Sequence, residues 1–179
     1  MVMVVEPASR SRLRIIADKI RELSGCGNVL YFPIVQFIEH KMPLLFPGFN
    51  LEILPEADFH PTIHGETEIG ERVIRLREDV YHGAISGKGR DRMTLAHEAG
   101  HYILLVANGL KLRRSFSGNS VEAFRDPEWQ AKAFAGELLC PYHLIKGMTA
   151  SQIASDCGVS NEAAQYHFGL RNQAARRFT

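Results

Sequence analysis

Two histidines and a glutamate in the segment HEAGH, residues 97–101, have the types and spacing of a metal-dependent hydrolase site. The segment lies within residues 93–106, whose apolar pattern predicts a helix. Residues four apart lie on one helix face about one turn from each other, so His97 and His101 can bind one metal ion. Glu98 points away from that pair, but its carboxylate can reach a water molecule in an open coordination position. We therefore expect His97 and His101 to be metal ligands and Glu98 to be the general base.

A catalytic zinc site needs a third protein ligand. Glu128 begins a predicted helix over residues 127–139, with Asp126 as its N-cap and Pro127 in its first turn. A carboxylate at this position is also favourable simply because it faces the positive end of the helix dipole. Glu128 lies near the edge of the apolar stripe of this helix and can point inward, and the need of the metal for a partner favours the ligand role over the dipole alone. The other downstream acidic candidates are Glu122, Asp126, Glu137 and Asp156.

Longer blocks of sequence surround these residues: RMTLAHEAGH at 92–101, DPEWQA at 126–131, FAGELLCP at 134–141 and VIRLREDVYHGA at 73–84. Together they resemble the ImmA/IrrE family of zinc metallo-endopeptidases, from about residue 32 to residue 168. The resemblance implies a Zn²⁺-dependent endopeptidase that cleaves a helix-turn-helix repressor encoded nearby and so relieves repression. On the matching positions, His97, His101 and Glu128 would bind the metal and Glu98 would be the catalytic glutamate.

Two residues depart from the family pattern. Lys132 stands where many members have Asn, one helical turn after Glu128 and in the favourable acid-before-base order. An ion pair between Lys132 and Glu128 would weaken the metal site. Cys140 stands where members often have Met, and we expect it to be a small buried apolar residue. The ligand set tolerates several metals, so the sequence does not decide between zinc, manganese and iron.

We expect the helices and strands that position these residues to form an α+β, zincin-like metallopeptidase fold with a small twisted sheet and the HExxH helix. Apolar residues at helical spacing predict helices over residues 7–23 and 33–42, the second closed by Pro43. Alternation predicts strands at 49–53, 62–64 and 73–76, the last as a sheet edge beside the site, where an extended substrate could pair with it. We expect a metallopeptidase domain at 1–141 and a helical appendage at 142–179.

A zinc peptidase also benefits from a hydrogen-bond donor for the oxyanion that forms on the scissile carbonyl. Tyr81, His82, His64 and His143 are the candidates, and we favour Tyr81 or His82. An ordinary surface or packing role remains open for each of them. The glycine-rich stretch 81–90 lacks the spacing of a phosphate loop, and we expect it to form a flexible rim of the cleft.

Residues 149–168 have the spacing of a helix-turn-helix, with Gly158 in the turn and Ser160 as the cap of the second helix. The second helix carries Glu162 and almost no cationic residues, so direct DNA binding is the less favoured alternative. Two other functions stay open beside the peptidase. One is a DNA-binding transcriptional regulator without activity, and the other is a toxin-antitoxin-like partner in which the metal is structural.

Composition excludes several classes of protein. With 179 residues, 45% hydrophobic and 23% charged, the chain is an ordinary globular one, and its formal charge of +1 predicts no bulk attraction to polyanions. The three cysteines, Cys26, Cys140 and Cys157, are scattered and odd in number, which indicates reduced thiols. No stretch reaches the ~20 apolar residues of a membrane span. We expect a cytoplasmic protein, and the sequence does not decide its oligomeric state.

Overall fold

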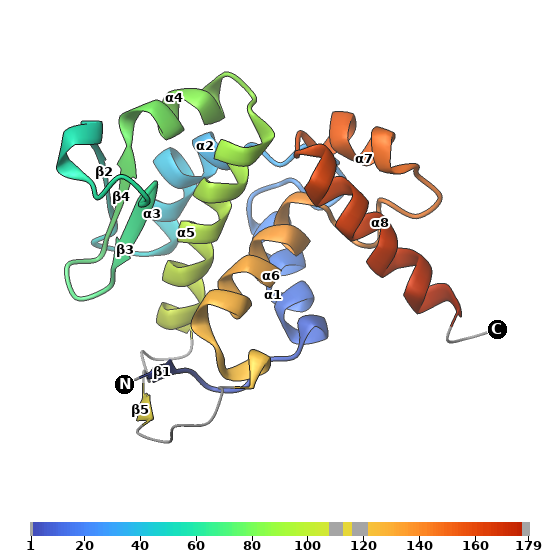
Figure 1. Cartoon of the computed structure of the whole chain (residues 1–179), viewed down its shortest axis with the longest axis horizontal. Coiled ribbons are helices and arrows are strands. Elements are labelled where there is room, and N and C mark those ends of the chain that lie inside the picture. Colours follow the sequence, from blue (N-terminus) through green and yellow to red (C-terminus); the bar gives the residue numbers. More distant parts are fainter. Residues whose placement is uncertain (1, 108–112, 116–121, 177–179) are drawn as a thin grey trace.

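Helices α5 (Gly89–Ala107) and α6 (Pro127–Leu139) lie side by side at the centre of the molecule (Figure 1). The computed structural model describes residues 2–107, 113–115 and 122–176. The two helices approach closely because Gly100 has no side chain: a Cβ there would lie 3.1 Å from the Ala131 carbonyl oxygen and 3.0 Å from the Phe134 ring. A glycine that costs helix propensity thus lets the second helix reach the first.

The N-terminal helices pack around this pair. Helix α1 (Arg10–Leu23) begins at Ser9, whose hydroxyl accepts a hydrogen bond from Arg12 N, and it packs against α6. A second helical segment comprises α2 (Ile34–Gln36), the π-helical turn η1 (Phe37–Lys41) and α3 (Met42–Leu45). Pro43 was expected to end this segment at Met42, which is wrong. Pro43 instead lies at the start of α3, directly after the π-helical turn, and the helical segment continues to Leu45.

A three-stranded sheet lies on one side of α5 (Figure 1). Its order is β2-β4-β3, with β2 (Asn50–Leu54) parallel to β4 (Val73–Arg77) and β3 (Gly65–Glu68) antiparallel to β4. The inner face is mainly apolar and includes the core residues Ile74 and Leu76. On the outer face Arg75 pairs with Glu52, Glu66 and Glu71. The short 3₁₀ turn η2 (Glu56–Asp58) follows β2.

Two expectations about this sheet are wrong. Residues 62–64 are not a strand, because the third strand begins only at Gly65. The strand at 73–77 is central, so the edge beside α5 is β3. At the end of β4, the Arg77 guanidinium binds Asp79, with Nε 2.6 Å from Oδ1, and only 6% of the residue is exposed.

Helix α4 (Glu78–Ile85) replaces most of the flexible rim expected at 81–90, and α5 begins at Gly89. Gly83 and Gly89 serve close packing, whereas Gly87 follows α4 in the left-handed region at φ 82°. A Cβ on Gly83 would lie 1.8 Å from Asp91 Oδ2, so the side chain that starts α5 occupies the space beside α4. The expectation of a mobile loop at this position is therefore wrong.

The C-terminal segment forms α7 (Ala150–Cys157) and α8 (Asn161–Arg176), joined by a turn with Gly158 at φ 64°. A capping box between Thr149 and Gln152 starts α7. The turn is packed against the start of α5, where a Cβ on Gly89 would lie 2.4 Å from Ser160 N. This confirms the helix-turn-helix shape, while the domain boundary near residue 141 stays a prediction.

Three short elements complete the fold. Strand β1 (Val2–Val4) pairs antiparallel with β5 (Arg113–Ser115), and the 3₁₀ turn η3 (Ala123–Arg125) precedes α6. Among the described residues, no helix is both long and apolar enough to cross a membrane.

Candidate metal centre

Three potential ligand side chains converge between α5 and α6. His97 Nε2 lies 3.0 Å from His101 Nε2 and 3.2 Å from Glu128 Oε2, and His101 Nε2 lies 3.3 Å from Glu128 Oε1. Ligand atoms about 2.05 Å from a tetrahedral zinc would be about 3.3 Å from one another. The observed separations therefore fit the three protein ligands of such a site, and the donor set of two imidazoles and one carboxylate suits a divalent metal.

Local sequence explains why Glu128 reaches the histidines. The Asp126 side chain accepts a hydrogen bond from Glu128 N at 3.0 Å, which fixes the first turn of α6 as predicted. The close approach at Gly100 then brings that turn to the histidine face of α5.

The other acidic candidates have different contacts in the structure. Asp126 caps α6, and Glu122 pairs with Arg125 at 3.5 Å. Asp156 accepts a hydrogen bond from Ser155, and Glu137 binds Arg10 and Arg14. Glu128 is thus the acidic residue that the structure groups with the two histidines.

The cluster is open to solvent on its glutamate side. The side chain of Glu128 is 70% exposed, against 25% for His97 and 15% for His101. Burial lowers the pKa of His97, and the neighbouring His101 lowers it further, which favours the neutral imidazole that binds metal. Lys132 acts in the same direction through its charge. Lys132 and Glu128 form no ion pair within 4 Å, although the structure describes both residues.

Glu98 occupies a different environment from the ligands on the same helix. It is only 7% exposed, and the Thr67 hydroxyl of β3 lies 2.8 Å from its Oε2 and 3.1 Å from its backbone oxygen. Burial raises the pKa of Glu98, and the hydrogen bond from Thr67 opposes that rise. Sequence reasoning missed Thr67, because the strand that carries it was predicted three residues too early.

The weaker catalytic candidates, Tyr81 and His82, lie on α4. The Tyr81 hydroxyl donates to Glu39, which raises the pKa of Tyr81 to about 12, and His82 Nε2 is 3.8 Å from Glu78. Within the described residues, no hydrogen bond or ion pair joins either side chain to His97, Glu98, His101 or Glu128. Their assignment as oxyanion donors stays a prediction.

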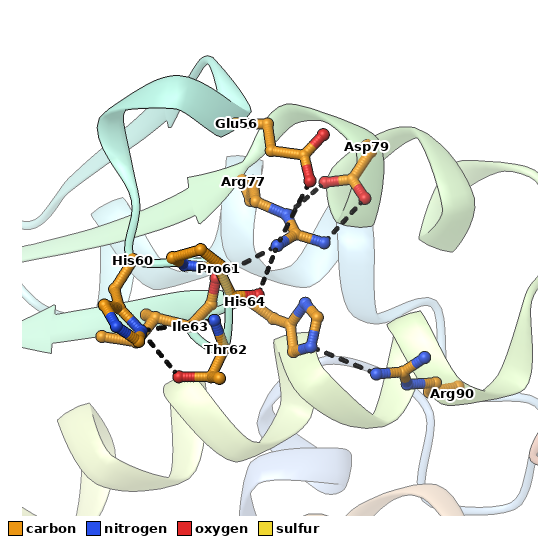
Figure 2. A network of polar contacts seen from close by, with 9 residues as sticks. All are labelled: Glu56, His60, Pro61, Thr62, Ile63, His64, Arg77, Asp79 and Arg90. Atoms are coloured by element: carbon orange, nitrogen blue, oxygen red, sulfur yellow. Dashed lines mark hydrogen bonds and ion pairs between the residues drawn. The ribbon is translucent and has the colours of Figure 1, made fainter.

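The other two histidine candidates also have partners elsewhere. Figure 2 shows His64, at the entry to β3, beside Arg90, with His64 Nε2 3.1 Å from the guanidinium. His143 lies far along the chain, near the Gly27 carbonyl and Asp18. Neither belongs to the ligand cluster.

The sequence was compared with models of protein families. Residues 78–168, just over half of the chain, match the Peptidase_M78 family, the IrrE N-terminal-like domain. The chain belongs to this family. The matched range contains both helices of the metal cluster, and membership of the M78 peptidase family supports a peptidase, and so a hydrolase, as the activity. The family resemblance expected from the sequence is confirmed.

Comparison with solved structures found a protein with a similar fold. A Mycobacterium tuberculosis transcriptional regulator superposes with a TM-score of 0.55 over 85% of this chain at 16% identity, which shows a shared fold. The match spans 44% of that protein, so this chain corresponds to less than half of its length. A search among curated proteins gave no match.

Proposed function

We propose that this protein is a zinc-dependent endopeptidase with a zincin-like fold, and that its substrate is a helix-turn-helix transcriptional repressor. One observation carries the proposal: a buried carboxylate, Glu98, lies next in sequence to one ligand of a cluster whose three side chains approach one another to 3.0–3.3 Å. A structural metal site needs no such carboxylate, whereas metal-assisted hydrolysis does.

Each of the four residues has a separate task in this mechanism. His97, His101 and Glu128 would hold the metal, and a bound Zn²⁺ supplies Lewis-acid polarisation of water and of the scissile carbonyl. Glu98 accepts a proton from the attacking water on its carboxylate and passes it to the nitrogen of the leaving amine. Burial of Glu98 favours this role, because a raised pKa brings a carboxylate closer to the range in which it both takes and gives a proton.

The sheet supports a protein substrate. Among the described strands, β3 pairs only with β4, so one side of its backbone is available to an extended segment beside α5. Recognition through the backbone is largely independent of sequence. The proposal of a repressor as substrate rests on the family resemblance, and cleavage of such a repressor would relieve repression.

A DNA-binding regulator is the first alternative. The solved structure with a similar fold is described as a transcriptional regulator, which is consistent with this alternative. The shape of α7 and α8 fits, but the exposed residues at the start of α8 carry no cation: they are Asn161, Glu162, Gln165 and Tyr166. A toxin-antitoxin-like partner with a structural metal is the second alternative. There, removal of the metal would unfold the protein.

Glu98→Gln tests the proposal. Wild type and variant are each co-expressed with the helix-turn-helix regulator that the neighbouring gene encodes. The amount of bound metal and the length of the regulator are then measured. We expect one zinc in both proteins, shortening of the regulator by wild type, and a loss of roughly a thousandfold in rate for the variant. Glu162→Gln, at an exposed position on α8, is the matched control and should cleave like wild type.

The other outcomes separate the alternatives. Binding of zinc by wild type without cleavage of the regulator contradicts the proposal and favours a non-catalytic metal. Specific DNA binding that Glu98→Gln leaves unchanged favours the regulator.

A further inference from the structure

Two residues of the edge strand β3 face Glu98. Gly65 and Thr67 lie two apart, so their side-chain positions share the inner face of the sheet. A Cβ on Gly65 would lie 3.1 Å from Glu98 Cγ, with Leu76 Cδ2 also at 3.1 Å and the Arg75 carbonyl oxygen at 3.3 Å. A side chain at residue 65 would therefore press Glu98 away from the strand. Thr67 contacts the same residue through its hydroxyl.

We propose that Thr67 is a positioning residue that holds the Glu98 carboxylate in its reactive orientation, in the space that Gly65 leaves open. This inference rests on the proposed function, because it assigns a task to Thr67 only if Glu98 is the general base. Neither Thr67 nor Gly65 belongs to the HExxH segment or to the ligand cluster.

The hydrogen-bond geometry supports this role. A threonine hydroxyl has one hydrogen to donate. Glu98 Oε2, at 2.8 Å, is the closer and charged acceptor, and the backbone oxygen of Glu98 is at 3.1 Å. The bond uses one acceptor position of Oε2, and both positions of Oε1 stay available for the proton. A glutamate has three side-chain torsions, and fixing them in advance removes the cost of ordering the base during the reaction.

The edge strand is itself anchored from the side away from Glu98. Figure 2 shows Arg77 among the residues that lead into β3, with its guanidinium 3.5 Å from the Pro61 carbonyl oxygen and 3.4 Å from that of Ile63. Arg77 N also donates to the His64 carbonyl oxygen at 3.1 Å. Glu98 is thus held by a strand that is itself fixed, and that strand is the one that would pair with an extended substrate.

Kinetics of three variants tests the role of Thr67. Thr67→Val keeps the branched shape and removes the hydroxyl, Thr67→Ser keeps the hydroxyl, and Thr62→Val removes an exposed hydroxyl just before β3 whose partner is His60. The probe is the purified regulator that wild type cleaves. We expect Thr67→Val to lower kcat about tenfold, as for loss of a hydrogen bond to a charged group, with KM within about twofold. Thr67→Ser and Thr62→Val should stay within about twofold of wild type in both constants.

Stability of the metal-free protein gives a second readout that needs no substrate. Thr67→Val should lower Tm by about 4 °C in the wild-type background and by less than about 2 °C in Glu98→Ala, where the carboxylate is absent and only the backbone oxygen of residue 98 remains as an acceptor. Equal shifts in both backgrounds, or an unchanged kcat for Thr67→Val, would overturn the inference. If wild type cleaves no regulator, the proposed function fails instead, and the two Tm shifts alone decide whether Thr67 holds Glu98.

Discussion

The two glutamates of α6 differ in exposure and in the side chains that they contact. Glu137, near the C-terminal end, is 2% exposed and binds Arg14 Nε at 2.8 Å and Arg10 Nη1 at 3.2 Å. Glu128, in the first turn, is 70% exposed and faces two imidazoles. One carboxylate is neutralised by the chain's own cations. The other lies beside two potential metal ligands, and a bound metal ion would neutralise its charge.

This difference separates stability from chemistry on a single helix. The Glu137 cluster joins α1 to α6 and extends to α8, since Arg10 also donates to the Tyr166 hydroxyl at 2.9 Å. Loss of Glu137 would leave partly buried cations unpaired. Loss of Glu128 removes a side chain that is 70% exposed, so we expect the stability of the metal-free protein to change little. The predictions below test this contrast, starting from the largest effect.

Glu128→Gln should weaken Zn²⁺ binding about a thousandfold while leaving the metal-free protein intact. Binding free energies of roughly 10–16 kcal/mol for structural zinc, shared among its ligands, give about 4 kcal/mol for one ligand. Competition with a chromophoric chelator measures the affinity, and thermal unfolding of the apoprotein should shift by less than about 0.5 kcal/mol. Unchanged zinc affinity would remove Glu128 from the ligand set.

Glu137→Gln should have the opposite profile. Breaking a buried ion pair by removing one partner costs roughly 3–5 kcal/mol, and the partial exposure of Arg10 and Arg14 places the loss near about 3 kcal/mol. For a chain of this size that corresponds to a Tm about 9 °C lower. Zinc affinity should stay within about threefold of wild type. A large loss of zinc affinity in this variant would show that the two ends of α6 are not independent.

Acid should destabilise the protein through His167, which belongs to the Glu137 end. His167 packs on Gly136, where a Cβ would lie 2.4 Å from its Nε2, and burial lowers its pKa to about 4, with Arg10 and Arg14 acting in the same direction and Glu137 against it. The unfolded chain, with a histidine pKa of about 6.5, then binds the proton more tightly. Stability is therefore lost as pH falls from about 6.5 and levels off below about 4.

The expected loss from His167 between pH 7.5 and pH 5 is about 2 kcal/mol. Urea unfolding at both values measures it, and His167→Gln should show a loss smaller by about that amount. The same dependence in wild type and variant would mean that other groups cause it.

The sequence predicted the site better than the surroundings, for a physical reason. His97, His101 and the capped start of α6 at Asp126 are local patterns, in which a few neighbouring residues determine the conformation, and the structure brings them together with Glu128. The close approach of α6 to α5 depends on Gly100, a single residue inside the same segment. Local rules suffice where a helix carries the chemistry.

The order of the sheet could not be predicted in this way. Residues 65–68 have no apolar side chain, because the inward-facing positions are Gly65 and Thr67, which lie against Glu98. Alternation therefore gave no strand there, and β4 was taken for the edge. The glycines at 83 and 89 were taken as signs of flexibility, yet each is needed because another segment lies against it, Asp91 in one case and the α7–α8 turn in the other.

Lys132, between the two ends of α6, should have the smallest effect. It forms no ion pair with Glu128 within 4 Å, so the loss of a ligand to Lys132, considered from the sequence, does not occur in the described structure. The charge of its ammonium group still lowers the pKa of His97, because it repels a second positive charge at this site. Lys132→Asn should therefore tighten zinc binding about threefold at low salt, as for an exposed charge, and by much less at 1 M salt, where screening reaches about 3 Å. Lys132→Arg, which keeps the charge, should match wild type, and a gain that persists at 1 M salt would point to a direct contact with the metal ligands.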